Sequence, residues 1–237
     1  MLPVTLADAA AFGFFVLAWV GYTFFADKLS RGGKNLMTVM HAFRLRWMKQ
    51  MMTRENRVQD VTALATQMRS VSLFASTTIF ILGALVALLG AVDEARNVIK
   101  DVPFAVQTVP GVWEAKLLVL LTVFVYAFFK FAWSLRQFNY ALTLIGSAPM
   151  PGETDKLDIN SAAGRLARIA TLAVASFNRG VRAYYFALAA LCWFIHPYLF
   201  LGSTALVIWV LYRREFRSFT LKTLTDPLGD PASRTEQ

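Results

Sequence analysis

The side chains best suited to chemistry in this chain are six arginine, asparagine and glutamine residues beside two apolar stretches. They are Arg136, Gln137, Asn139, Asn178, Arg179 and Arg182. Guanidinium groups form strong, charge-assisted hydrogen bonds with phosphates and carboxylates, and basic pockets between membrane helices bind anionic headgroups. The cluster therefore predicts contact with an anionic lipid or another anionic ligand. The alternative is structural, because the same groups could fix the inner loops and satisfy helix ends.

The sequence offers no recognisable catalytic or metal-binding constellation. A zinc site needs three or four Cys, His or acidic ligands close together, and the chain has two histidines and one cysteine. Neither a glycine-rich phosphate loop nor a G-x-S-x-G nucleophile elbow is present. His41 is interpreted as an interfacial polar residue, and His196 as a turn residue whose ring caps backbone groups. The sequence predicts a protein that is not an enzyme and has no cofactor.

The composition is that of an integral membrane protein. Hydrophobic residues make up 57 % of the chain and charged residues 16 %, with a mean hydropathy of +0.49. Soluble domains are typically about 45–50 % apolar and about 25 % charged. The net charge of +9 would suggest nucleic acid in a soluble chain. Here most Lys and Arg flank apolar blocks, so a bilayer with anionic lipids is the expected partner, and nucleic acid is not.

The apolar blocks of the sequence predict an all-α fold with one helical membrane domain, residues 1–224. A polar disordered tail, residues 225–237, is predicted to follow it. About 20 apolar residues cross a bilayer. Five transmembrane helices are preferred over four, at about residues 6–25, 72–90, 113–133, 181–196 and 197–213. The last two form a hairpin because Pro197 stops one helix near His196 and suits the first turn of the next. A single kinked helix is the alternative.

The distribution of positive charge predicts the orientation in the cell inner (plasma) membrane. Cytoplasmic loops are rich in Lys and Arg. Residues 27–71 and 134–182 are strongly basic and are expected inside, whereas residues 91–112 are expected outside. The hairpin brings Arg213 and Arg214 inside, but a single kinked span would leave them outside. The sequence therefore favours a multi-pass protein with its N-terminus outside and its C-terminus in the cytoplasm.

Two stretches between the spans have the pattern of amphipathic cytoplasmic helices. In the first, bulky apolar residues recur at spacings of three and four, as on one helical face. Four residues of this stretch are expected to contact the membrane surface: Arg44, Arg46, Trp47 and Lys49. Alternatively, this helix packs onto the protein's own spans. The second amphipathic helix leads directly into the span that begins near residue 181.

Small residues form a stripe along the second span. They are Ser76, Gly83, Ala87 and Gly90, at helical spacings. Small residues let helix backbones approach closely in lipid. The stripe is predicted to meet another span of this chain, with another copy as the alternative.

Four motifs together resemble a known family. They are WSLRQFNY at residues 133–140, NRGVRAYYF at 178–186, WFIHP at 193–197 and YRREF at 212–216. As a set they resemble the domain-of-unknown-function 599 family of bacterial and plant membrane proteins, from about Ala10 to Leu224. The resemblance implies a multi-span membrane protein and supplies no activity, substrate or catalytic residue.

Two functions are consistent with the sequence. The first is a non-catalytic inner-membrane protein, an accessory subunit that packs against, stabilises or helps assemble a membrane complex. The alternative is a small oligomeric transporter or channel for an anionic or lipid substrate. Proton-coupled carriers usually place acids or histidines within the membrane, and the predicted spans contain almost none.

Overall fold

The computed structural model is helical throughout the described residues, which are 5–32, 35–100, 108–152 and 156–225. Nearly all of the predicted tail, residues 226–237, lies outside them. The elements, in order, are α1 (Leu6–Gly32), α2 (Leu36–Met52), α3 (Val58–Gly90), α4 (Val92–Lys100), α5 (Pro110–Gly146), α6 (Lys156–Leu191), the 3-10 turn η1 (Cys192–Phe194), α7 (Pro197–Phe216) and α8 (Phe219–Thr225). The predicted all-α fold is confirmed.

Three helical segments are long and apolar enough to cross a membrane: Leu6–Lys28, Val58–Gly90 and Pro110–Gly146. The last two, with 33 and 37 residues, exceed the predicted spans at 72–90 and 113–133. At 1.5 Å per residue each is about 50 Å or more long, against a hydrocarbon core about 30 Å thick. Each of these two helices is therefore longer than one crossing requires.

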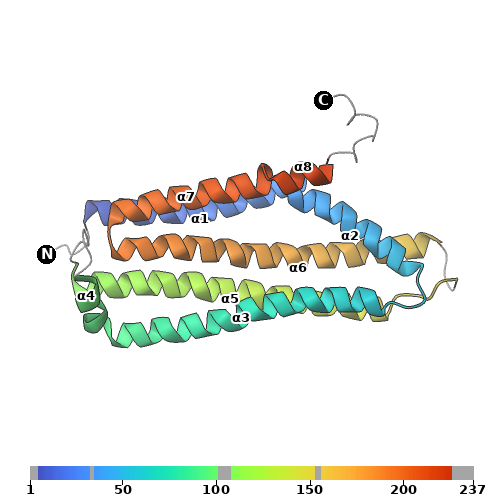
Figure 1. Ribbon diagram of the computed structural model, residues 1–237, viewed down its shortest axis with the longest axis horizontal. Helices are drawn as coiled ribbons and strands as arrows, with labels where there is room; N and C mark the ends of the chain where they lie inside the picture. The colour runs from blue at the N-terminus through green and yellow to red at the C-terminus, as the bar shows by residue number, and fades with distance from the viewer. Residues whose placement is uncertain (1–4, 33–34, 101–107, 153–155, 226–237) are drawn as a thin grey trace, which may run out of the picture.

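α6 lies at the centre of the molecule (Figure 1). α1 and α7 run together along one side of it, and α5 and α3 lie on the other side. α2 crosses the far half of α6, and α4 covers the opposite end beside α5. The connections from α2 to α3 and from α5 to α6 therefore lie at the α2 end, and the turn from η1 into α7 lies at the α4 end.

The turn between α6 and α7 matches the predicted hairpin. α6 ends at Leu191, one turn of η1 follows, and His196 in extended conformation is the N-cap of α7. Its Nδ1 accepts the backbone N–H of Tyr198 at 3.2 Å, as predicted for a capping ring. Ser203 Oγ donates to Ala189 O at 3.1 Å across the hairpin. The alternative of a single kinked helix is wrong, because Pro197 begins a new helix that runs back along α6.

Small residues allow α5 and α6 to approach closely. A Cβ added to Gly180 would lie 2.8 Å from Cδ1 of Phe131, so only glycine fits against this ring. One turn away, Ser134 Oγ donates to Ala173 O at 2.7 Å. Close approach of backbones and short interhelical hydrogen bonds are typical of helices that associate in lipid. This interface holds the two longest helices in a fixed register.

α2 packs onto the rest of the protein. Asn35 caps its first turn by accepting the N–H of Thr38 at 2.9 Å. Met48, Met51 and Met52 are fully buried, and the helix lies along α6. This is the arrangement that the sequence left as an alternative to a helix lying flat in the interface.

The small-residue stripe of α3 lies on the outside of the molecule. Ser76, Gly83, Ala87 and Gly90 are all exposed. A Cβ added to Gly83 or Gly90 would meet no atom within 4 Å. The prediction that this stripe meets another span of the same chain is therefore wrong. α3 packs mainly along α5, and it places Phe74 and Thr78 in contact with Tyr184 of α6.

Candidate functional site

Two of the predicted anion-binding arginines lie in an internal ion network. Arg182 is 7 % exposed; its Nε donates to Glu215 at 2.7 Å and its Nη1 to Asp27 at 3.2 Å. Arg179 donates from Nε to the other oxygen of Asp27 at 2.8 Å. Tyr22 OH donates to Glu215 at 3.0 Å. The network joins α1, α6 and α7, and its two cations and two anions neutralise each other.

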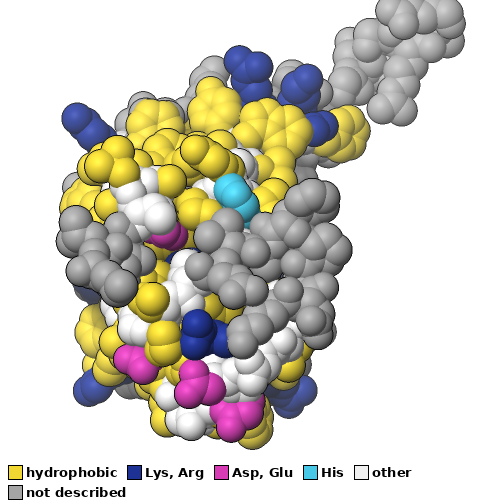
Figure 2. Space-filling model, turned by 90° about the vertical axis from the view of Figure 1, so that its left-hand side faces the viewer, with side chains coloured by type: hydrophobic (Ala, Val, Ile, Leu, Met, Phe, Trp, Pro, Cys, Tyr) yellow, Lys and Arg dark blue, Asp and Glu magenta, His cyan; other side chains and the backbone are white. Residues whose placement is uncertain are grey.

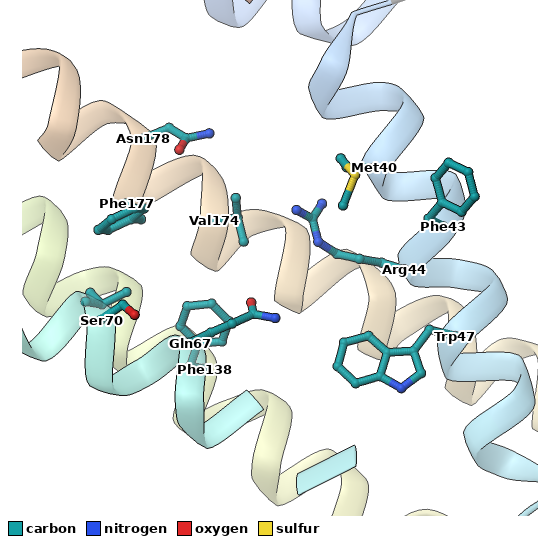
Figure 3. A pocket seen from close by; sticks show the side chains of 11 residues that line it. Met40, Phe43, Arg44, Trp47, Gln67, Ser70, Phe138, Val174, Phe177 and Asn178 are labelled. Carbon is teal, nitrogen blue, oxygen red and sulfur yellow. The ribbon is translucent and has the colours of Figure 1, made fainter. Parts of the chain in front are cut away.

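The other members of the predicted cluster do not lie together. Gln137 is buried between α5 and α6, where its amide lies 2.8 Å from Ser176 Oγ. Arg136 and Asn139 are exposed on α5, and Arg136 Nε donates to Tyr140 OH at 2.8 Å. Asn178 faces a groove on the α2 side of α6 (Figure 3). The proposed contact of this set with an anionic ligand stays a prediction, and four of the six residues already have partners in the chain.

A groove lies between α2, α3 and α6. It has a volume of about 550 Å³ and is open on one side. Its walls are mainly apolar: Met40, Phe43 and Trp47 from α2, Phe138 from α5, and Val174 and Phe177 from α6. Gln67, Ser70 and Val71 of α3 form the opposite wall. Its volume is within the range of about 300–1,000 Å³ typical of small-molecule sites.

Arg44 is the charged residue of this groove. Its side chain extends from α2 toward α6, between Met40 and Trp47 (Figure 3). A second, smaller cavity of about 240 Å³ lies on the other side of Met40 and Arg44 and reaches Arg182 and Glu215. Arg44 Nη1 donates to Thr171 Oγ1 at 3.3 Å. Burial lowers the pKa of the Arg44 guanidinium from its usual range, and arginine side chains remain protonated in proteins.

Hydrogen bonds on each side of Arg44 fix the position of α2. His41 Nδ1 lies 2.9 Å from Thr171 Oγ1 on α6. Trp47 Nε1 donates to the buried Asp60 of α3 at 2.6 Å, and Arg54 donates to the same oxygen at 2.7 Å. Because of these bonds, the wall that carries Arg44 and Trp47 is held against both α3 and α6. Arg46 and Lys49, also predicted to contact the membrane surface, are exposed on α2.

The opposite end of the molecule has a second buried ion pair. Asp8 of α1 is 1 % exposed and Lys116 of α5 is 3 % exposed, with 3.7 Å between Oδ1 and Nζ. Lys116 also donates to Trp193 O at 2.8 Å, and Trp193 Nε1 donates to Asp8 at 2.8 Å. Acidic side chains gather on the lower part of this end face, which Figure 2 shows. The pair is sealed inside the protein, so it connects α1, α5 and η1 rather than facing a ligand.

Among the described residues there is no group of three or more His, Cys, Asp or Glu that could hold a metal ion.

The sequence from residue 10 to 220 matches the family model described as "Protein of unknown function, DUF599". The chain belongs to the DUF599 family. This confirms the resemblance seen in the four motifs. No curated protein and no solved structure matches the chain.

Three of the four motifs that marked DUF599 contain residues of the ion network or the hairpin. Arg179 and Arg182 lie in NRGVRAYYF, Glu215 lies in YRREF, and His196 and Trp193 lie in WFIHP. In WSLRQFNY, Ser134 and Gln137 make the buried contacts of α5 with α6. The motifs therefore correspond to the contacts that hold the helices together.

Sequence reasoning missed the acidic members of these pairs. Asp27 and Glu215 each follow a long apolar run and are surrounded by basic residues, so they were interpreted as parts of cytoplasmic loops. An acid at the end of an apolar helix needs a cation when the helix packs against others, and this rule would have singled out both. Lys116 was missed because it stands near the start of a predicted span, where a lysine is expected to reach the headgroups.

Proposed function

We propose that this protein is a non-catalytic membrane protein that associates laterally, through α3, with another membrane protein or with a second copy of itself. The observation that supports this proposal is the outward position of the small-residue stripe Ser76, Gly83, Ala87 and Gly90. A helix that faces only lipid gains nothing from small residues, whereas a helix that meets another helix in lipid does. Large apolar residues flank the stripe, with Leu73 67 % and Phe80 79 % exposed.

Replacing Gly83 with leucine should weaken this association roughly tenfold, because overfilling a close contact typically costs about 1–3 kcal/mol. The protein is purified in mild detergent and its native mass spectrum is recorded. Wild type should retain a stoichiometric partner, either a foreign protein or a second copy. Gly21→Leu is the matched control, since Gly21 is an exposed glycine of α1 with equal space around it. A wild-type spectrum of the monomer alone would refute the proposal.

We further propose five crossings of the cell inner membrane, with the end of α6 and α7 as the fourth and fifth. α7 lies beside α1, which is apolar enough to span, and α6 lies between α7 and α5. The ion network and the basic residues Arg213 and Arg214 are at the α2 end of these helices. By the charge rule that end is cytoplasmic, and the residues before α1 are outside.

Reporter fusions test this topology. A reporter fused after Gln237 should be active if it works only in the cytoplasm and inactive if it works only outside. A fusion in α4, after Arg96, should give the opposite pattern, and it serves as the control for reporter folding. Cytoplasmic activity at both positions, or at neither, is incompatible with five crossings in this orientation.

A second candidate function is supported by the groove at Arg44. A small oligomeric transporter or channel for an anionic or lipid substrate needs a site where an anion meets apolar walls at the membrane. The groove combines one arginine with apolar side chains beside α3. Flux of labelled anionic lipid across vesicles that contain the purified protein separates this function from lateral association alone, because only the transporter accelerates it.

A further inference from the structure

The groove between α2 and α3 has the shape and surface of a site for a hydrocarbon chain. Met40 and Trp47 extend from α2 on the side of α6 (Figure 3), and Phe43, Val174 and Phe177 also line the groove. The cavity of about 550 Å³ is partly open to the surface of the protein. An apolar hollow of this size in contact with water would leave hydrocarbon surface unburied, which is unfavourable. An apolar occupant removes this cost.

The charge in the groove requires an anion. Three charged residues line the two cavities: Arg44, Arg182 and Glu215. Arg182 and Glu215 bond to each other, so their charges are compensated. Asp60, the acid bound to Trp47 next to the groove, is already bonded to Arg54. Arg44 therefore has a hydroxyl, Thr171, as its described partner and no carboxylate. A half-buried guanidinium without a counter-ion is unfavourable, so an anionic group beside it is stabilised.

The place of the groove along the chain separates a lipid from a soluble anion. Ser70 and Val71 of α3 line it, and the apolar residues 72–90 begin directly after them. On α6, Asn178 lines it shortly before the apolar half of that helix. The opening therefore lies level with the end of the apolar segments, where the headgroups of a bilayer meet its hydrocarbon core. Lipids are the anions with hydrocarbon chains that are present at this depth.

From these observations we propose that the groove binds one anionic lipid, with an acyl chain between α2 and α3 and its headgroup on Arg44. This site differs from the cluster around Arg179 and Arg182, whose charges are neutralised within the protein. It is also independent of lateral association through Gly83, because it lies at the α2 end of α3 and not along the outward stripe. On this proposal, Arg44 of α2 contacts lipid at one defined site.

The experiment measures retention of single lipids by the full-length protein in native mass spectra. Detergent micelles are doped with dioleoyl-phosphatidylglycerol, which is anionic, or with dioleoyl-phosphatidylcholine, which has the same chains and no net charge. Wild type should retain one phosphatidylglycerol with at least about tenfold preference, as expected for a charge-assisted hydrogen bond. Arg44→Gln should lose that preference. Arg46→Gln, which removes an exposed charge two residues away, should keep it.

A steric pair of variants tests the acyl chain separately. Ser70→Trp fills the groove from an exposed position and should abolish retention, whereas Ser72→Trp, also exposed on α3 and outside the groove, should not. Unchanged melting temperatures show that each variant is folded. Equal retention of the two lipids by wild type, equal losses in Arg44→Gln and Arg46→Gln, or displacement of the lipid by inorganic phosphate alone would each overturn the proposal.

Discussion

Replacing Arg182 with methionine should lower the free energy of unfolding by about 3 kcal/mol. The arginine is 7 % exposed, and its loss leaves Glu215 and one oxygen of Asp27 without a cation. Removing one partner of a buried ion pair typically costs about 3–5 kcal/mol, because the remaining charge is buried and uncompensated. The lower end applies since the two carboxylates are 25 % and 27 % exposed. Titration with a denaturing detergent in mixed micelles measures the change.

Arg179→Met is the matched control for this prediction. Arg179 is 30 % exposed, and after its removal Asp27 still has Arg182 as a partner. The loss should be about 1 kcal/mol or less, as for partly solvated pairs. In the double variant Arg182→Met with Glu215→Gln, more than half of the loss should return, because the glutamine is neutral and still accepts from Tyr22. Equal losses for Arg179→Met and Arg182→Met would contradict the central position of Arg182.

Local signals in the sequence were sufficient for the all-α fold and the hairpin. The turn at Pro197 was predicted because proline has no N–H and its fixed φ suits the start of a helix. The cap at His196 was predicted, whereas the cap that Asn35 forms with the N–H group of Thr38 was not. The spans predicted at 72–90 and 113–133 are shorter than α3 and α5. Hydropathy marks where a helix is apolar, but polar residues continue a helix equally well when it packs against neighbours outside the bilayer.

The rotation of α3 could not be obtained from its own sequence. Its small residues and its large apolar residues are both suited to a helix contact in lipid. The choice depends on its neighbours: Phe74 lies against Phe131 of α5 and Tyr184 of α6. Tyr184 OH also lies 2.8 Å from Thr78 Oγ1. Tyr184 is 106 positions from Thr78 and 110 positions from Phe74, and no local sequence pattern connects them.

The candidate site could be predicted only in part from the sequence, because it too depends on contacts between helices far apart in the chain. The sequence identified arginines near the inner ends of the spans, and it included Arg44 among the residues expected at the membrane surface. Arg182 is paired with two carboxylates, which come from α1 and α7, whereas the described partner of Arg44 is a hydroxyl. A count of charges within each loop cannot show which arginine remains uncompensated. Only the packing of α1 and α7 against α6 makes that distinction.

Replacing Lys116 with methionine should also destabilise the protein, by about 3–5 kcal/mol. Both partners of the Lys116–Asp8 pair are almost inaccessible, at 3 % and 1 % exposed, so Asp8 would keep a buried charge with no cation. Trp193 O would lose its donor at the same time, which by itself costs about 1–3 kcal/mol. The pair joins α1, α5 and η1, and the change should therefore loosen the α4 end of the molecule.

A double variant separates the ion pair from the hydrogen bond to Trp193. Lys116→Met with Asp8→Asn removes both charges, and the asparagine oxygen still accepts from Trp193 Nε1. The double variant should be more stable than Lys116→Met alone, by about 2 kcal/mol, because the part of the loss that remains is the donor to Trp193 O. Hydrogen exchange of the backbone near Trp193 should stay faster than in wild type in both variants. If the single and double variants are equally unstable, the lysine acts through its hydrogen bond to Trp193 O, and the charge of Asp8 contributes nothing.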